Sequence, residues 1–188
     1  YEGTFITKTA IRIAPLVFVR PGELRHAKWS DIDLDLGTWD YTPPKTRSKT
    51  GVQHIVPLSK QVVEALIDLQ PITRCSEFVF PAITTQLKPM SENTINQALR
   101  RMGYTSEQVC GHGFRASART ILEEVLGYPI EIIEQQLAHK VKDMHGRAYN
   151  RTKHLDKRRK MMQHWSDYCD EIKNNYSKSR EVKSREIM

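Results

Sequence analysis

Apolar residues recur at three- and four-residue steps through much of this sequence, and this spacing predicts amphipathic helices. The first such stretch covers residues 6–20, and the Pro21-Gly22 pair that follows ends its pattern. A second, shorter helix is expected from Glu23 to about Trp29. Five further helices are predicted: residues 60–69, 91–102 with Ser91 as the N-cap, 115–126, 129–137 with Pro129 as the first helical residue, and 156–172.

β-rich segments lie at residues 39–42 and 54–58, on either side of a stretch rich in proline, glycine and lysine. This pattern predicts a hairpin or a three-stranded sheet with a basic tip, although a solvated lysine-rich loop is the plainer alternative. Residues 78–81 look like a short buried extended segment that ends at a proline. The expected fold is therefore mainly α with a small antiparallel β-sheet in the N-terminal third.

Composition favours one globular domain, because 188 residues with 39% hydrophobic and 27% charged side chains can bury a single sizeable core. No apolar run is long enough for a membrane helix, so a cytoplasmic protein is expected. The chain begins at Tyr1 rather than methionine, so it is expected to be a piece of a longer polypeptide. Its three widely spaced cysteines indicate neither a disulfide framework nor a zinc site.

The positive charge of the chain indicates what kind of partner it could bind. The formal net charge of +7 and a pI near 9.4 favour a polyanion such as nucleic acid, although many basic proteins have no such partner. Residues 173–188 are almost entirely polar and carry a net positive charge, which predicts a mobile basic tail.

Candidate chemistry concentrates in a stretch of about forty residues that holds His112, Arg115, His139 and Tyr149. Cationic side chains hold and neutralise a phosphodiester, and a phenol among them can attack it. No metal-binding motif such as HExxH accompanies the histidines, and no GxSxG marks a serine hydrolase. No acid is obviously placed to orient either histidine. Singly, each of these residues is equally well explained as an ordinary polar group.

Five separated boxes change this balance when they are taken together: Val19-Arg20-Pro21-Gly22-Glu23-Leu24, Ser48-Lys49-Thr50-Gly51 followed by Val56-Pro57-Leu58, His112-Gly113-Phe114-Arg115, Leu137-Ala138-His139 and Ala148-Tyr149. In this order and spacing the sequence resembles the tyrosine recombinases, and among them the phage and genomic-island integrases. The resemblance runs from the first helix to about residue 172. The ten-residue step from His139 to Tyr149 is typical of the island-type integrases.

The resemblance assigns roles to particular residues. The catalytic set it implies is Arg20, Lys49, His112, Arg115, His139 and Tyr149, with Glu23 as a supporting acid and Tyr149 as the nucleophile. Lys49 is preferred to Lys45 because it lies seven residues before Val56. Ala138 stands where many members have glycine, a difference not expected to matter. Four further basic residues are expected to contact DNA: Lys45, Arg47, Arg119 and Arg151.

The resemblance also implies an integrase catalytic-domain fold over residues 1–172 and an upstream DNA-binding domain that this chain lacks. The implied activity cuts and rejoins double-stranded attachment-site DNA through a 3′-phosphotyrosine, without metal or cofactor. The implied assembly is a homotetramer on DNA, and the implied partners are an excisionase and a host DNA-bending protein. The implied location is the bacterial nucleoid, with no membrane association. Two alternatives stay open: relaxation of DNA as by a type IB topoisomerase, and a non-catalytic DNA-binding regulator.

Overall fold

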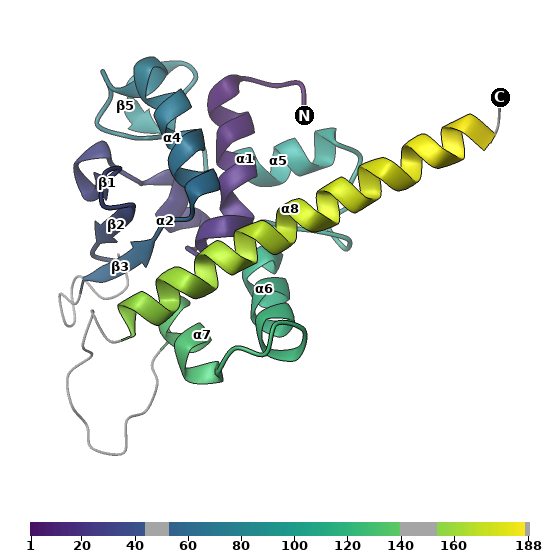
Figure 1. The fold of residues 1–188 in the computed structure, drawn as a ribbon. Coiled ribbons are helices and arrows are strands. Elements are labelled where there is room, and N and C mark those ends of the chain that lie inside the picture. The colour runs from purple at the N-terminus through teal and green to yellow at the C-terminus, as the bar shows by residue number, and fades with distance from the viewer. Residues whose placement is uncertain (44–52, 140–153, 187–188) are drawn as a thin grey trace.

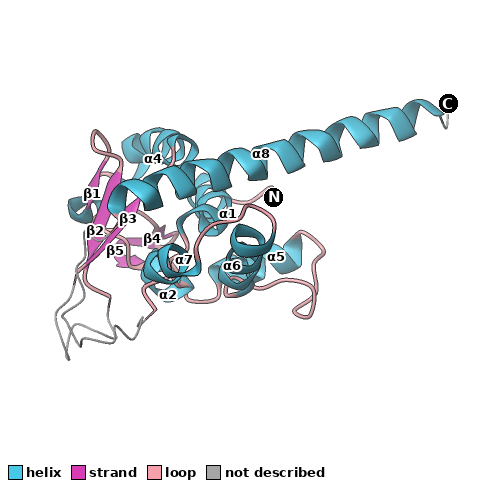
Figure 2. Ribbon diagram, turned by 60° about the horizontal axis from the view of Figure 1, so that its bottom comes forward, coloured by secondary structure: helices cyan, strands magenta, loops and turns pink. Residues whose placement is uncertain are grey.

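The computed structural model describes residues 1–43, 53–139 and 154–186, with side chains described as far as residue 179. Helices dominate, and two small antiparallel sheets gather at one end of the molecule (Figures 1 and 2). In chain order the elements are α1 (Phe5–Val17), α2 (Pro21–Arg25), η1 (Trp29–Asp31), β1 (Ile32–Asp33), β2 (Thr38–Tyr41), β3 (His54–Pro57), α4 (Lys60–Thr73), β4 (Pro81–Ala82), β5 (Thr85–Pro89), α5 (Thr94–Arg101), α6 (Gly113–Glu124), α7 (Ile130–Gln136) and α8 (Leu155–Glu186).

Helix α1 is the centre of the core and contacts α4, α5, α6 and α8. The hydroxyl of Thr4 caps its first turn by accepting the Thr7 N–H at 3.4 Å. Its apolar face, with Ala10, Ile13 and Val17, is almost fully buried. The helix ends where Phe18 adopts a left-handed φ of 57°. This turn redirects the chain at once into α2.

The strand predictions at residues 39–42 and 54–58 are confirmed by β2 and β3, which pair antiparallel in a three-stranded sheet of order β1-β2-β3. Alternation along β2 buries Trp39 and Tyr41 on one face. The predicted basic tip, residues 43–51, lies outside the described residues apart from residue 43 itself.

The second sheet, β4 paired with β5, was not predicted. Val79 and Phe80 are buried and Phe78 forms an isolated bridge with Lys28, but Pro81 begins a strand instead of ending one. Strand β5 is mostly exposed and polar, so it carries no alternation of apolar and polar residues. Its pairing with β4 depends on the tight connection between Ala82 and Thr85, and the spacing of apolar residues does not predict such a turn.

Several predicted helix limits are wrong, and the first helix already ends at Val17 rather than Arg20. The second helix ends at Arg25 rather than Trp29, which instead opens the 3₁₀ turn η1. Helix α5 begins at Thr94 after Asn93, so Ser91 contributes its carbonyl to a preceding turn instead of capping the helix. Pro129 occupies the N-cap position of α7, one residue before the first helical residue. Such shifts reflect local turn chemistry that overrides periodicity.

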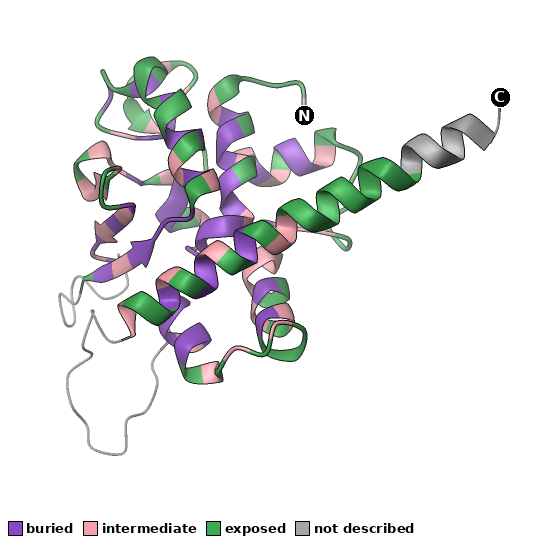
Figure 3. Ribbon diagram, in the orientation of Figure 1, coloured by how far each residue is buried: buried purple, intermediate pink, exposed green. Residues whose placement is uncertain are grey.

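Helix α8 crosses the body of the molecule and then extends away from it (Figure 1). Its first half is partly buried, with Met161, Met162 and Trp165 in the core, whereas residues 171–179 are exposed (Figure 3). The helix was expected to end near Ile172, and it continues to Glu186. No glycine or proline interrupts the chain there. Within the described chain, no helix combines the length and apolar character required to span a membrane.

Candidate active site

Arg20 stands at the N-cap of α2, directly after the turn at Phe18. Its backbone N–H donates to Glu23 Oε2 at 2.8 Å, and its Nη1 donates to Glu23 Oε1 at 2.9 Å. The Glu23 carboxylate is buried, whereas the Arg20 side chain is about 29% exposed. Glu23 therefore holds the Arg20 guanidinium in place while leaving part of it open to a ligand.

Tyr41 completes this arrangement from strand β2. Its hydroxyl donates to Glu23 Oε2 at 3.0 Å. Burial, followed by the neighbouring Glu23 carboxylate, raises the pKa of Tyr41 above its ordinary value, so the phenol remains a neutral donor. Sequence reasoning did not single out Tyr41. The signal available was its place on the buried face of β2.

Arg115 lies in the first turn of α6 and is fixed by two main-chain carbonyls. Its Nη1 donates to Phe18 O, and its Nη2 donates to Leu137 O at 2.7 Å. Burial and the nearby positive charge of Arg20 lower the pKa of Arg115. The contact with Phe18, two residues before Arg20, brings the two predicted arginines into one electrostatic neighbourhood although 95 positions separate them in the sequence.

His112 is the N-cap residue of α6, and its carbonyl accepts the Arg115 N–H at 3.3 Å. Its side chain is exposed. The preceding Gly111 is packed closely against α2, since a Cβ there would come within 3.2 Å of Pro21 Cγ. This approach places the start of α6 against the start of α2. The His112 and Arg20 boxes are therefore neighbours in space.

His139 follows the end of α7, where Ala138 turns the chain with a left-handed φ of 52°. Its Nε2 lies 3.4 Å from Arg115 Nη2, and its Nδ1 lies 2.6 Å from Glu134 Oε2. The expectation that no acid orients either histidine is thus wrong for His139. Glu134 was missed because a five-residue step is not a helical-face spacing, and the contact exists only because Ala138 reverses the chain.

Arg119 contacts two carboxylates: its Nε donates to Glu134 Oε1 at 2.7 Å, and its Nη1 donates to Glu123 Oε2 at 3.2 Å. Its predicted role in DNA contact stays a prediction. Lys45, Arg47, Lys49, Tyr149 and Arg151 lie outside the described residues, and their assigned roles also stay predictions.

A buried polar network lies behind this cluster and joins β3, α7 and α8. His54 Nε2 donates to the carbonyl of Gln136 at 3.1 Å, and Arg158 Nε donates to the Gln136 side-chain oxygen at 2.9 Å. Arg158 Nη2 also donates to Ile55 O. Burial and the Arg158 charge lower the pKa of His54 to about 3, so this imidazole is neutral. The network fixes Gln136 three residues before His139.

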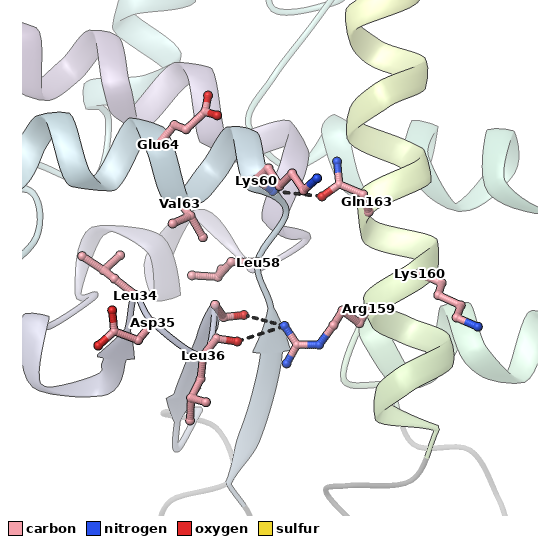
Figure 4. Close-up of a pocket in the computed structure, with 11 residues that line it drawn as sticks. Leu34, Asp35, Leu36, Leu58, Lys60, Val63, Glu64, Arg159, Lys160 and Gln163 are labelled. Carbon is pink, nitrogen blue, oxygen red and sulfur yellow. Dashed lines mark hydrogen bonds between the residues drawn. The ribbon is translucent and has the colours of Figure 1, made fainter.

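A separate open groove of about 570 Å³ lies between the β1–β2 turn, α4 and α8 (Figure 4). Arg159 reaches across it from α8 and donates to the carbonyls of Leu36, at 3.0 Å, and Gly37, at 3.3 Å. None of the predicted site residues lines it. Within the described ranges, no three His, Cys, Asp or Glu side chains gather in a way that could hold a metal ion.

Comparison with known proteins gives one family. Residues 3–156 match the sequence profile of the Phage integrase family. The integrase of Enterobacteria phage P4 is 42% identical over 189 aligned residues, which cover 94% of this chain and 43% of that protein. The chain therefore spans less than half the length of this curated relative.

Solved structures agree on the fold. The integrase from mycobacterium phage Brujita superposes with a TM-score of 0.63 at 21% identity, covering 87% of this chain and 52% of that one. A lambda integrase tetramer bound to a Holliday junction gives a TM-score of 0.52 at 22% identity, covering 77% of this chain and 44% of that one. At these identities the likeness establishes the fold alone, which confirms the predicted mainly helical fold with a small antiparallel sheet.

Proposed function

This chain belongs to the Phage integrase family, and from that premise we propose that it is the catalytic portion of a site-specific DNA recombinase. The proposed activity cuts and rejoins double-stranded DNA through a covalent 3′-phosphotyrosine. The observation that carries this proposal is the meeting of Arg20, Arg115 and His139, which come from three separate elements. The Glu23 carboxylate offsets one of the two positive charges, and the charge that remains suits an anionic group such as a phosphodiester.

The proposed reaction is an in-line displacement at phosphorus. The phenol oxygen of Tyr149 bonds to phosphorus, the bond from phosphorus to the 5′ oxygen breaks, and a 3′-phosphotyrosine results. The phenol proton passes to a base, and the leaving 5′ oxygen takes a proton from an acid, which we assign to Lys49. His112 and His139 share phosphate contact and proton handling. Attack by a 5′ hydroxyl on the phosphotyrosine reverses these steps and reseals the strand.

The arginines stabilise the charge that develops on the non-bridging oxygens during this displacement. A guanidinium offers forked hydrogen bonds that match two oxygens, and a lysine ammonium does not. Arg20 and Arg115 are already held by Glu23 and by main-chain carbonyls, so little rearrangement is needed when substrate arrives. The two guanidiniums supply the charge neutralisation that a metal ion supplies in other phosphoryl-transfer sites, so the proposed scheme uses no cofactor.

The proposed substrate is double-stranded attachment-site DNA, and the proposed location is therefore the bacterial nucleoid. Lys45, Arg47, Arg119 and Arg151 are proposed to contact its phosphates. A homotetramer that exchanges strands in pairs is proposed as the active assembly, a state in which lambda integrase has been seen on a Holliday junction. Upstream DNA-binding domains, an excisionase and a host DNA-bending protein belong to the same proposal.

The decisive experiment incubates the chain with a nicked suicide DNA substrate and measures the covalent protein–DNA adduct. The wild-type chain should form the adduct, and Tyr149→Phe should form none while still binding DNA, because only the attacking oxygen is removed. Tyr176→Phe is the matched control, since Tyr176 is exposed on α8, and it should behave as wild type.

Three results would contradict the proposal. An adduct formed by Tyr149→Phe would assign the nucleophile to another tyrosine, with Tyr128, Tyr168 and Tyr176 next in order. DNA binding by the wild-type chain without any adduct would indicate a non-catalytic regulator. Relaxation of plasmid DNA without preference for a site would indicate a topoisomerase.

A further inference from the structure

The carboxylate of Glu134 is engaged on both oxygens by side chains of the candidate active site. Oε1 accepts from Arg119 Nε at 2.7 Å, and Oε2 lies 2.6 Å from His139 Nδ1. The side chain of Glu134 is only 21% exposed. Burial acts to raise its pKa, but hydrogen bonds from Arg119 and His139 more than offset this and lower it, so the group is a carboxylate.

Hydrogen-bonding capacity then decides the state of the neighbouring ring. A carboxylate only accepts, so Nδ1 of His139 must carry the proton. In the neutral ring Nε2 is consequently an acceptor, and it faces the donor Nη2 of Arg115 at 3.4 Å. Donors and acceptors therefore alternate without conflict from Arg119 through Glu134 and His139 to Arg115.

We propose that Glu134 is a positioning residue that fixes the tautomer and orientation of His139, and that Arg119 holds Glu134 in place for this task. This inference rests on the function proposed above. It gives Arg119, on α6, and Glu134, on α7, a role in the reaction although neither contacts the reacting atoms in the proposed scheme. The consequence is that Nε2 of His139 presents its lone pair beside Arg115, where the phosphate is proposed to bind.

The sharpest test is Glu134→Gln, because glutamine has nearly the same shape but only one acceptor atom. If its oxygen faces Arg119, its NH₂ group faces His139 Nδ1, and the ring proton must move to Nε2, where it opposes the Arg115 donor. If the amide is reversed, the NH₂ group opposes Arg119 instead. Glu123→Gln is the matched control, since Glu123 is the other carboxylate partner of Arg119.

The direct measurement is the ¹⁵N NMR spectrum of the His139 imidazole in the 188-residue chain. The wild type and Glu123→Gln should show a proton on Nδ1, and Glu134→Gln should show a shift toward the Nε2-protonated form. An unchanged tautomer in Glu134→Gln would overturn the proposal. Because this measurement requires no DNA, it tests Glu134 even if the chain proves to have no recombinase activity.

The second measurement is single-turnover adduct formation on the suicide substrate. Glu134→Gln should slow it about 10- to 100-fold, by analogy with the loss seen when the partner that orients a metal-ligating histidine is removed. The Kd for DNA and the Tm should change little, and Glu123→Gln should match the wild type. A rate equal to wild type in Glu134→Gln would overturn the proposed role, whereas a wild-type chain that forms no adduct would overturn only the recombinase assignment.

A variant that keeps the carboxylate guards against a folding defect in Glu134→Gln. Arg119→Met removes the second contact of Glu134 but leaves Oε2 facing His139. It should retain the Nδ1-protonated tautomer and lose less rate than Glu134→Gln. A loss as large as that of Glu134→Gln, with the tautomer retained, would show that the charge of Arg119 matters and the orientation of His139 does not.

Discussion

The two arginines of the site are anchored in different ways. Arg20 is paired with a carboxylate that is itself held by Tyr41, and its side chain is partly open. Arg115 donates to two carbonyls that belong to other elements. Arg20 is thus oriented by a residue three positions away, whereas Arg115 connects α6 to the end of α1 and the end of α7.

This difference predicts different results for the same substitution. Arg20→Lys and Arg115→Lys should each slow single-turnover cleavage by roughly 10²- to 10³-fold, the usual loss for one transition-state donor. Only Arg115→Lys should also lower the Tm clearly, because each buried carbonyl left without its donor costs about 1–3 kcal/mol. Cleavage that stays unchanged, with equal loss of DNA affinity in both variants, would identify the arginines as simple phosphate anchors.

Ala138 carries a backbone conformation that favours glycine. A left-handed φ costs an L-residue about 1–2 kcal/mol, while glycine adds about 0.4–1 kcal/mol of unfolded-chain entropy. Ala138→Gly should therefore raise the free energy of unfolding by about 0.5–1 kcal/mol in urea titrations. Cleavage should be unchanged, since the position of His139 is kept. A lower stability would show that the Ala138 methyl group packs productively.

Residue spacing points to those site residues whose relationships are local, and the family resemblance supplied the others, including His139. Arg20 with Glu23, and His112 with Arg115, are three residues apart at helix starts, so a shared direction could be expected from spacing alone. Tyr41 and Glu134 could not be found in this way. Their contacts depend on strand pairing and on the turn at Ala138, which involve tertiary structure and a backbone conformation that residue types do not specify.

At the scale of elements, the presence of a helix or strand was easier to predict than the residues at which it begins and ends. Helices and the β2–β3 pair were recovered because burial of one face imposes a period of 3.6 or 2. The β4–β5 hairpin and the outer half of α8 were not recovered. Both are largely exposed, so no burial pattern marks them.

The two halves of α8 should respond differently to mutation. Deleting residues 173–188 should leave the Tm nearly unchanged, because the residues described there make few contacts with the body, and should weaken DNA binding slightly through the lost positive charge. Trp165→Ala is the contrasting variant. Trp165 is buried, donates to Pro15 O at 2.9 Å and packs edge-on against Phe18, so its loss should cost about 3–5 kcal/mol. A large Tm drop on truncation would show that the outer half is packed structure.

At the scale of the whole molecule, the network of His54, Gln136 and Arg158 ties the sheet to the last two helices. Its stability depends on pH because His54 is neutral when folded. Its pKa is about 3 in the folded chain against an ordinary 6.5. Below pH 6.5 the unfolded chain takes up a proton that the folded chain does not, so stability is complete above pH 6.5 and falls as the pH decreases toward 3.

The expected slope is about 1.4 kcal/mol per pH unit in this window. Urea unfolding at pH 7.5 and 5.5 should show that the wild type loses about 1.4 kcal/mol more than His54→Gln, which keeps an N–H donor but does not titrate. Equal losses in the two chains would mean that His54 is protonated in the folded state or does not remain buried.

The same network bears on the order of events during translation. Arg158 follows Ile55 by 103 residues and Gln136 by 22. At about 5–20 residues per second, roughly 5 to 20 s pass between synthesis of Ile55 and of Arg158. A nascent chain therefore contains Arg20, Arg115 and His139 before it possesses the guanidinium that holds α7 against the sheet. The ribosome completes the scaffold last, so an unfinished chain has these groups, which are proposed to act on DNA, but not the framework that aligns them.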